Sequence, residues 1–130
     1  MQKFLFLFLT SFFCHAALGQ SPDCSKFREG KFRIADTQAG VVTIAERRGM
    51  YQTESSESLK AVVRFRVIWQ DNCSFTLRLD KVIRNENKID FPANLEIRVR
   101  IIETNANGYI QEVSSTLAPN SYRVEATRVN

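Results

Sequence analysis

Few side chains in this sequence could carry covalent or metal chemistry. The only histidine, His15, lies in an N-terminal segment that we expect to be removed. A histidine-activated nucleophile is therefore excluded, and zinc or copper would lack its usual ligand. Paired carboxylates remain a route to hydrolysis, but the candidates fall at turns or outward strand positions: Asp71, Asp80, Glu96 and Glu103. We therefore expect a protein that is not an enzyme and that uses no cofactor and no metal.

The cysteines predict a disulfide bond between Cys24 and Cys73. These two remain once Cys14 is lost with the N-terminal segment, and an even pair of cysteines in an exported chain is normally oxidised. Two free thiols are the alternative, which an oxidising compartment disfavours. The bridge would close a loop of about 50 residues, which the chain-entropy model values at roughly 4 kcal/mol.

Residues 1–19 have the pattern of a Sec-type signal peptide. A lysine precedes the apolar run 4–13, and small residues at Ala17 and Gly19 place the cleavage site before Gln20. An uncleaved anchor is the rival interpretation, but the run is shorter than the ~20 apolar residues of a membrane span. A lipoprotein signal is disfavoured by the bulky phenylalanines that precede its cysteine. We expect export to the periplasm or the medium, with residues 20–130 forming a single domain.

Five arginines are expected on the outer face of the predicted sheet, where they could form a basic patch: Arg64, Arg66, Arg78, Arg98 and Arg100. With a formal net charge of +4 on the chain, such a patch could attract nucleic acid or anionic lipid headgroups. Acidic residues are interspersed among these arginines, and no outward aromatic side chain is placed to stack with a base. We therefore interpret them as a solvated outer face and expect no nucleic-acid partner.

The elements that must position these residues begin with a hairpin over residues 59–79. Apolar residues occupy alternate positions on both sides of its turn, which is typical of strands with one buried face: Ala61, Val63, Phe65, Val67, Trp69, Cys73, Phe75, Leu77 and Leu79. A three-residue loop, 70–72, keeps both rows on one side and pairs Phe65 with Leu77. The same register sets Trp69 opposite Cys73. We expect Trp69 in the core beside the disulfide and not as a ligand platform.

The rest of the chain shows the same alternation in short segments. Further strands are predicted over 31–34, 41–46, 50–54, 95–103, 109–114 and 122–129, the inward face of 109–114 being left open. The longest connection is predicted over 81–94, where a proline excludes a regular central strand, and another turn over 118–120. We predict an all-β fold, an antiparallel meander of about eight short strands in a small lipocalin-like barrel or strongly curled sheet.

Several blocks of the sequence resemble a family of small exported β-domain proteins from flavobacteria and their relatives. Residues 24–32 are similar to that family's opening pattern of Cys, two residues, Phe, two residues, Gly, any residue and Phe. Residues 67–77 hold a Trp and a Cys four positions apart, and residues 47–54 hold a basic residue followed by Gln-any-Glu. The family's glycine before the sixth strand is replaced by residues 92–94. The resemblance implies an exported β-domain with its two cysteines paired. Some members carry a topoisomerase IV label, which cannot apply to a chain without room for a DNA-cleavage domain.

Two functions are compatible with these features. We expect a non-enzymatic binding or structural module of the cell envelope that contacts a protein or glycan through its outer surface or loops such as 81–94. The alternative is a small lipocalin-like carrier of an apolar ligand. The predicted inward rows contain no charged residue and should fill the barrel without a ligand cavity: Phe32, Ile34, Val63, Phe65, Val67, Trp69, Phe75, Leu77, Leu79, Ile97, Val99, Ile101, Tyr122 and Val124.

Overall fold

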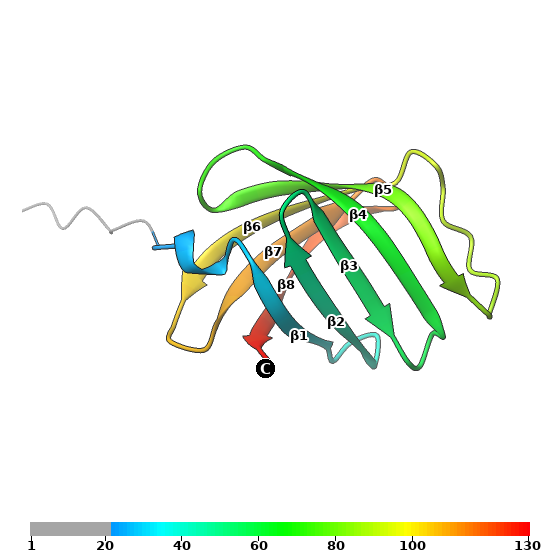
Figure 1. Ribbon diagram of the computed structural model, residues 1–130, viewed down its shortest axis with the longest axis horizontal. Coiled ribbons are helices and arrows are strands. Elements are labelled where there is room, and N and C mark those ends of the chain that lie inside the picture. Colours follow the sequence, from blue (N-terminus) through cyan, green and yellow to red (C-terminus); the bar gives the residue numbers. More distant parts are fainter. Residues whose placement is uncertain (1–21) are drawn as a thin grey trace, which may run out of the picture.

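The computed structural model describes residues 22–130, which form a closed barrel of eight strands preceded by a short 3-10 helix (Figure 1). The elements are η1 (Ser25–Phe27), β1 (Gly30–Asp36), β2 (Val41–Arg48), β3 (Tyr51–Ser56), β4 (Ala61–Trp69), β5 (Ser74–Asn85), β6 (Glu96–Thr104), β7 (Gly108–Ser115) and β8 (Ala118–Arg128). The predicted signal peptide, residues 1–19, lies outside the described residues. Within residues 22–130 there is no helical segment with the length and hydrophobicity of a membrane span.

The strands follow one another around the barrel in chain order, and neighbouring strands are antiparallel. β1 closes against β8 over a short seam, in which Phe32, Arg33 and Ile34 pair with Arg128, Thr127 and Ala126. The predicted all-β meander of eight strands is confirmed, and its closed form is the one found. Closure pairs backbone groups that an open sheet would expose at its edges.

The two ends of the barrel differ. The β2–β3, β4–β5 and β6–β7 connections lie at one end, which η1 covers, with Cys24 and Phe27 almost completely buried. A disulfide bond joins Cys24 to Cys73, with their Cα atoms 5.3 Å apart, and so ties the segment before η1 to the β4–β5 connection. The predicted disulfide is confirmed. We call this the closed end, and we call the opposite end, where β1–β2, β3–β4, β5–β6 and β7–β8 connect, the open end.

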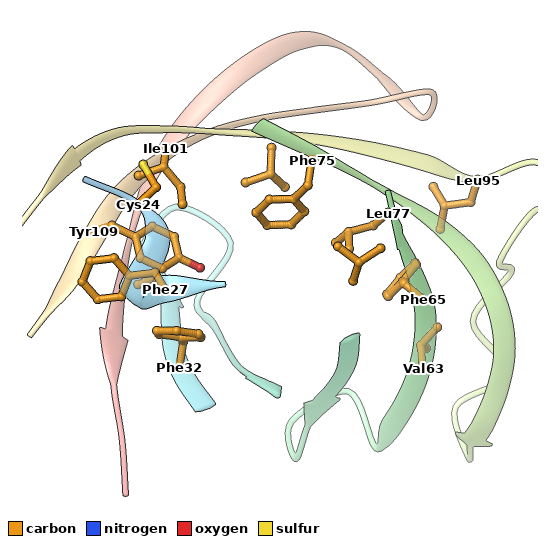
Figure 2. Close-up of a cluster of buried hydrophobic side chains, with 13 residues drawn as sticks. Cys24, Phe27, Phe32, Val63, Phe65, Phe75, Leu77, Leu95, Ile101 and Tyr109 are labelled. Carbon is orange, nitrogen blue, oxygen red and sulfur yellow. The ribbon is translucent and has the colours of Figure 1, made fainter. Parts of the chain in front are cut away.

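Buried side chains from opposite walls point toward one another inside the barrel (Figure 2). Aromatic rings gather toward the closed end, where Phe27, Phe32 and Tyr109 lie with ring centroids between 5.2 and 6.1 Å apart. Toward the open end the labelled side chains are Val63, Leu95 and the single ring of Phe65. The clustered rings therefore fill the closed end, while mostly aliphatic groups lie in the opposite half.

The register predicted for the central hairpin is wrong by two residues. Phe65 pairs with Leu79 and not with Leu77, and Trp69 pairs with Phe75 and not with Cys73. The turn is longer than predicted because the Asp71 carboxylate accepts a hydrogen bond from the backbone N–H of Cys73 at 2.8 Å, which makes a side-chain-stabilised turn. A shift of two residues leaves every side chain on its predicted face, so the apolar row still points inward.

Two predicted connections are in fact strands. β5 continues to Asn85, within the connection predicted over 81–94, because two register shifts let it follow β4 as far as the Ala61–Asn85 pair. β8 begins at Ala118, inside the turn predicted over 118–120. Pro119 fits there because this part of β8 has no partner on β1, so no ladder donor is lost on that side. The open question about β7 is resolved, since Tyr109, Gln111 and Val113 are its buried residues.

Candidate functional site

The lumen is hollow toward the open end, so the prediction of a packed barrel without a cavity is wrong. Two hollows of ≈ 280 and ≈ 290 Å³ share a set of lining residues: Thr43, Glu54, Ile97, Val113 and Tyr122. Small side chains at inward positions contribute to the space, among them Ala61 and Ser56. The bulky inward rows predicted from the sequence line this space and do not fill it.

One wall of the lumen is apolar. It is formed by inward residues of β4, β5 and β6 together with the segment before β6: Ala61, Val63, Phe65, Leu77, Phe91, Leu95, Ile97 and Val99. Figure 2 shows Val63, Phe65, Leu77 and Leu95 directed into the same space. These strands alternate cleanly in the sequence, which is why their inward faces were predicted correctly.

The facing wall, on β2 and β3, is polar. Arg47 of β2 lies opposite Gln52 of β3 in the strand register, and Glu54 is the next inward residue of β3. Arg47 Nη1 donates to Gln52 Oε1 at 2.7 Å, and Gln52 Nε2 donates to Glu54 Oε1 at 2.8 Å. These three side chains form a hydrogen-bonded row, which we call the polar row. It runs from the filled closed end to the hollow.

Arg47 is 1% exposed, which is rare for an arginine and requires that its N–H groups find partners. Its Nη2 donates to the carbonyl oxygen of Phe27 at 2.6 Å and to the Tyr109 hydroxyl at 3.1 Å, and its Nε donates to the carbonyl oxygen of Arg28 at 3.0 Å. The guanidinium carbon also lies 4.6 Å from the centroid of the Phe75 ring. The carbonyls at η1 and the surrounding rings therefore stabilise the charge without a carboxylate in direct contact.

Glu54 lines both hollows and ends the polar row. Burial raises the pKa of its carboxyl group, and the hydrogen bond from Gln52 and the charge of Arg47 only partly offset that effect. At the mouth, burial also raises the pKa of the Tyr122 hydroxyl, with smaller contributions from Asp36 and Glu54. The charges of Asp36 and Glu54 therefore both act on the Tyr122 hydroxyl.

The charged residues that line the hollows are all acidic. Glu54 lines both, Asp36 lines the one nearer β1, and Asp90 lines the one beside the β5–β6 connection. Within residues 22–130, neither hollow has a lysine, arginine or histidine in its lining. This is a marked local bias in a chain whose formal net charge is +4. No group of three His, Cys, Asp or Glu side chains in the described part of the chain is placed to hold a metal ion.

The five arginines predicted as a basic patch lie on β4, β5 and β6, and carboxylates are placed among them. Arg64 Nε lies 2.6 Å from Asp80, and Arg100 Nη2 lies 3.3 Å from Glu112. Two others, Arg78 and Arg98, both approach Glu96, and the remaining one, Arg66, pairs across the strands with Arg78. The register predicted from the sequence would set Arg64 opposite Arg78, and this pairing is wrong because Arg64 pairs with Lys81. Three carboxylates therefore lie among four of the five arginines, so the patch does not present a continuous positive surface.

The carboxylates considered for hydrolysis are not brought together. Asp80 and Glu96 are engaged with arginines on the outer face, and Asp71 stabilises the β4–β5 turn. Glu103 is exposed near the end of β6. None of these four residues lines either hollow.

Trp69 lies at the closed end and is partly buried. It packs against the core, with its ring centroid 4.7 Å from that of Phe75. The Arg28 guanidinium lies over the indole ring, with its carbon 4.4 Å from the ring centroid. Cys73 is likewise packed against the core, and Trp69 lines neither hollow.

Sequence reasoning missed the polar row. The inward face of β2 and β3 carries Arg47, Gln52 and Glu54, while the outward face of the same strands is also largely polar, so alternation does not distinguish the two faces. One signal was present, because the basic residue and the Gln-any-Glu of residues 47–54 formed part of the resemblance to the exported β-domain family. These residues are the polar row.

Comparison with known proteins gives no match, since no family model, no curated protein and no solved structure is significantly similar to this chain. The resemblance to the exported β-domain family stays a prediction.

Proposed function

We propose that this protein is a non-enzymatic binding protein that holds a small, largely apolar molecule in the lumen of its barrel. The observation that carries the proposal is the hollow at the open end, bounded by an apolar wall on β4–β6 and a polar row on β2–β3. Binding sites for small molecules are typically concave and mostly apolar, with a few placed polar groups. Eight-stranded barrels are large enough to hold one small ligand, as in lipocalins.

The rim of the open end supports entry from this side. Leu59 and Leu117 line the hollow and remain 39% and 60% exposed. They lie in the β3–β4 and β7–β8 connections, on either side of the opening. Exposed leucines at a mouth give an apolar molecule a surface to contact before it enters.

The disulfide fits a protein that works outside the reducing cytoplasm. We further propose export by the signal peptide of residues 1–19, to the periplasm or the medium. In such a compartment a lipocalin-like carrier would keep an apolar molecule in solution.

Recognition of an envelope protein or glycan through the outer surface is the second candidate. It is favoured by the neighbouring side chains Val82 and Ile83 near the end of β5, which are 37% and 51% exposed. Lumen binding is preferred because it accounts for both the hollow and the polar row, whereas a surface module needs neither.

The lumen proposal is tested by titrating the protein with N-phenylnaphthylamine, a neutral apolar fluorophore. Thr43 lines both hollows from β2, so Thr43→Phe should fill the space and abolish the fluorescence increase. Val42 is its outward neighbour and is 39% exposed, so Val42→Phe is the matched control and should bind as the wild type does. Absence of binding by the folded wild type, or equal binding by Thr43→Phe, would contradict the proposal.

A further inference from the structure

The chemistry of the lumen lining indicates which head group its occupant carries. Every charged side chain that lines the hollows is a carboxylate, and Glu54 stands at the inner end, where the apolar wall and the polar row meet. Only one of its oxygens, Oε1, accepts the hydrogen bond from Gln52. A carboxylate has further acceptor sites, so Glu54 can still accept a hydrogen bond from a molecule in the hollow.

Arg47 does not offset the negative charge of the lining with a positive group of its own in the hollow. It lines neither hollow, and its N–H groups are directed to the carbonyl oxygens of Phe27 and Arg28, to Tyr109 and to Gln52. The Gln52 side chain lies between it and Glu54. An anionic head group in the hollow would therefore meet Glu54 without a facing guanidinium.

We propose that the occupant of the lumen is an amphipathic amine, whose protonated nitrogen binds the Glu54 carboxylate while its apolar body lies against Val63, Phe65 and Ile97. This inference rests on the proposed function and names its ligand class. A cationic donor gains both a hydrogen bond and charge attraction from a carboxylate in a site of low polarity. A fatty acid would place two like charges together, and a neutral alcohol would gain the hydrogen bond alone.

The test compares three ligands with the same octyl chain in displacing N-phenylnaphthylamine: octylamine, octanol and octanoate. We expect the wild type to bind octylamine about tenfold or more tightly than octanoate, with octanol between them. Glu54→Gln keeps the size and the hydrogen bond of the side chain but removes its charge. It should abolish the preference for octylamine over octanol and leave octanol affinity within about twofold of wild type.

Glu46→Gln is the matched control. This substitution also removes a carboxylate, but from a residue of β2 that lines neither hollow. In the wild type, Glu46 forms an ion pair at 2.7 Å with the exposed Arg48. The substitution should leave all three affinities unchanged. A Glu46→Gln protein that lost the amine preference would mean that net charge, and not the lumen, sets selectivity, and this would overturn the inference.

A pH series gives a second readout that does not depend on a variant. Octylamine stays protonated across the acidic range, so its affinity relative to octanol should fall on acidification as Glu54 is protonated, and Glu54→Gln should show a flatter profile. The charged and titratable groups around Glu54 are Arg47, which reaches it by way of Gln52, the Tyr122 hydroxyl, and the carboxylates of Asp36 and Asp90 in the same hollows. Burial raises the pKa of Glu54, so the fall should begin above the range of an exposed glutamate.

The two proposals fail separately. If N-phenylnaphthylamine does not bind the folded wild type, the lumen proposal fails and the ligand class fails with it. If the fluorophore binds but octylamine displaces it no better than octanoate, or if Glu54→Gln keeps the wild-type amine preference, the amine inference is overturned while the lumen proposal stands.

Discussion

Replacing Arg47 by methionine tests whether the buried guanidinium holds the closed end together. Methionine has a long apolar side chain, so the substitution keeps much of the volume and removes the donors. Three acceptors would lose their partner: the buried carbonyl oxygen of Phe27, the buried Gln52 Oε1 and the partly buried carbonyl oxygen of Arg28. We leave out Tyr109, because its hydroxyl group can rotate toward another partner.

The expected loss follows from these three acceptors. A buried polar group left without a hydrogen bond costs about 1–3 kcal/mol, so the two fully buried acceptors alone give about 2 kcal/mol or more. Because small domains are stable by about 5–15 kcal/mol, Arg47→Met should remain folded but unfold at a clearly lower urea concentration.

The assay is urea denaturation followed by tryptophan fluorescence. Trp69 is the single tryptophan of the chain and lies against Phe75, so its emission reports the closed end. Arg48→Met is the control, because that side chain is 78% exposed and its ion pair with Glu46 should contribute less than about 1 kcal/mol. If Arg47→Met unfolds within about 1 kcal/mol of wild type, then the polar row is not a structural network and the explanation of the closed end is wrong.

Three further predictions concern stability. Cys24→Ser in combination with Cys73→Ser should lower the free energy of unfolding by roughly 4 kcal/mol, and an unchanged melting temperature would contradict the entropic role of the bridge. Glu54→Gln should melt higher than wild type at neutral pH and nearly equally in acid. Folding raises the pKa of Glu54, so its stability contribution is present below its ordinary pKa and is lost as the pH rises through the raised one; equal melting at neutral pH would count against a buried carboxylate. Gly108→Ala would place a Cβ atom against the Ala126 carbonyl oxygen, so the β7–β8 pairing must shift at a cost of about 1–3 kcal/mol, and an unchanged urea midpoint would refute that close approach.

The fold was predictable because alternation and hairpin-length turns were strong along most of the chain. The inward rows of β4, β5 and β6 were identified from the sequence because apolar and polar residues alternate over most of their length. The register of the β4–β5 hairpin was not predictable, since a shift of two residues preserves the alternation and the deciding interaction is one hydrogen bond that the Asp71 carboxylate accepts from the Cys73 N–H.

The candidate site was not predictable for a different reason. Apolar periodicity marks an inward face only where that face is apolar, and β3 turns Gln52, Glu54 and Ser56 toward the lumen. Arg47 is buried only because η1, from a distant part of the sequence, brings its carbonyl oxygens to the guanidinium. Such a partner is set by tertiary structure and leaves no local pattern.

The most direct test of lumen binding is a nuclear Overhauser experiment on the protein with octylamine in excess. Binding inside the barrel predicts intermolecular cross-peaks between the alkyl protons and the methyl groups of Val63, Ile97 and Val113, which line the hollow. The methyl groups of the outward Val42 serve as the internal control and should show none. Cross-peaks confined to Val42 and other outer residues, or none at all at saturating ligand, would contradict the proposal that this barrel holds its ligand inside.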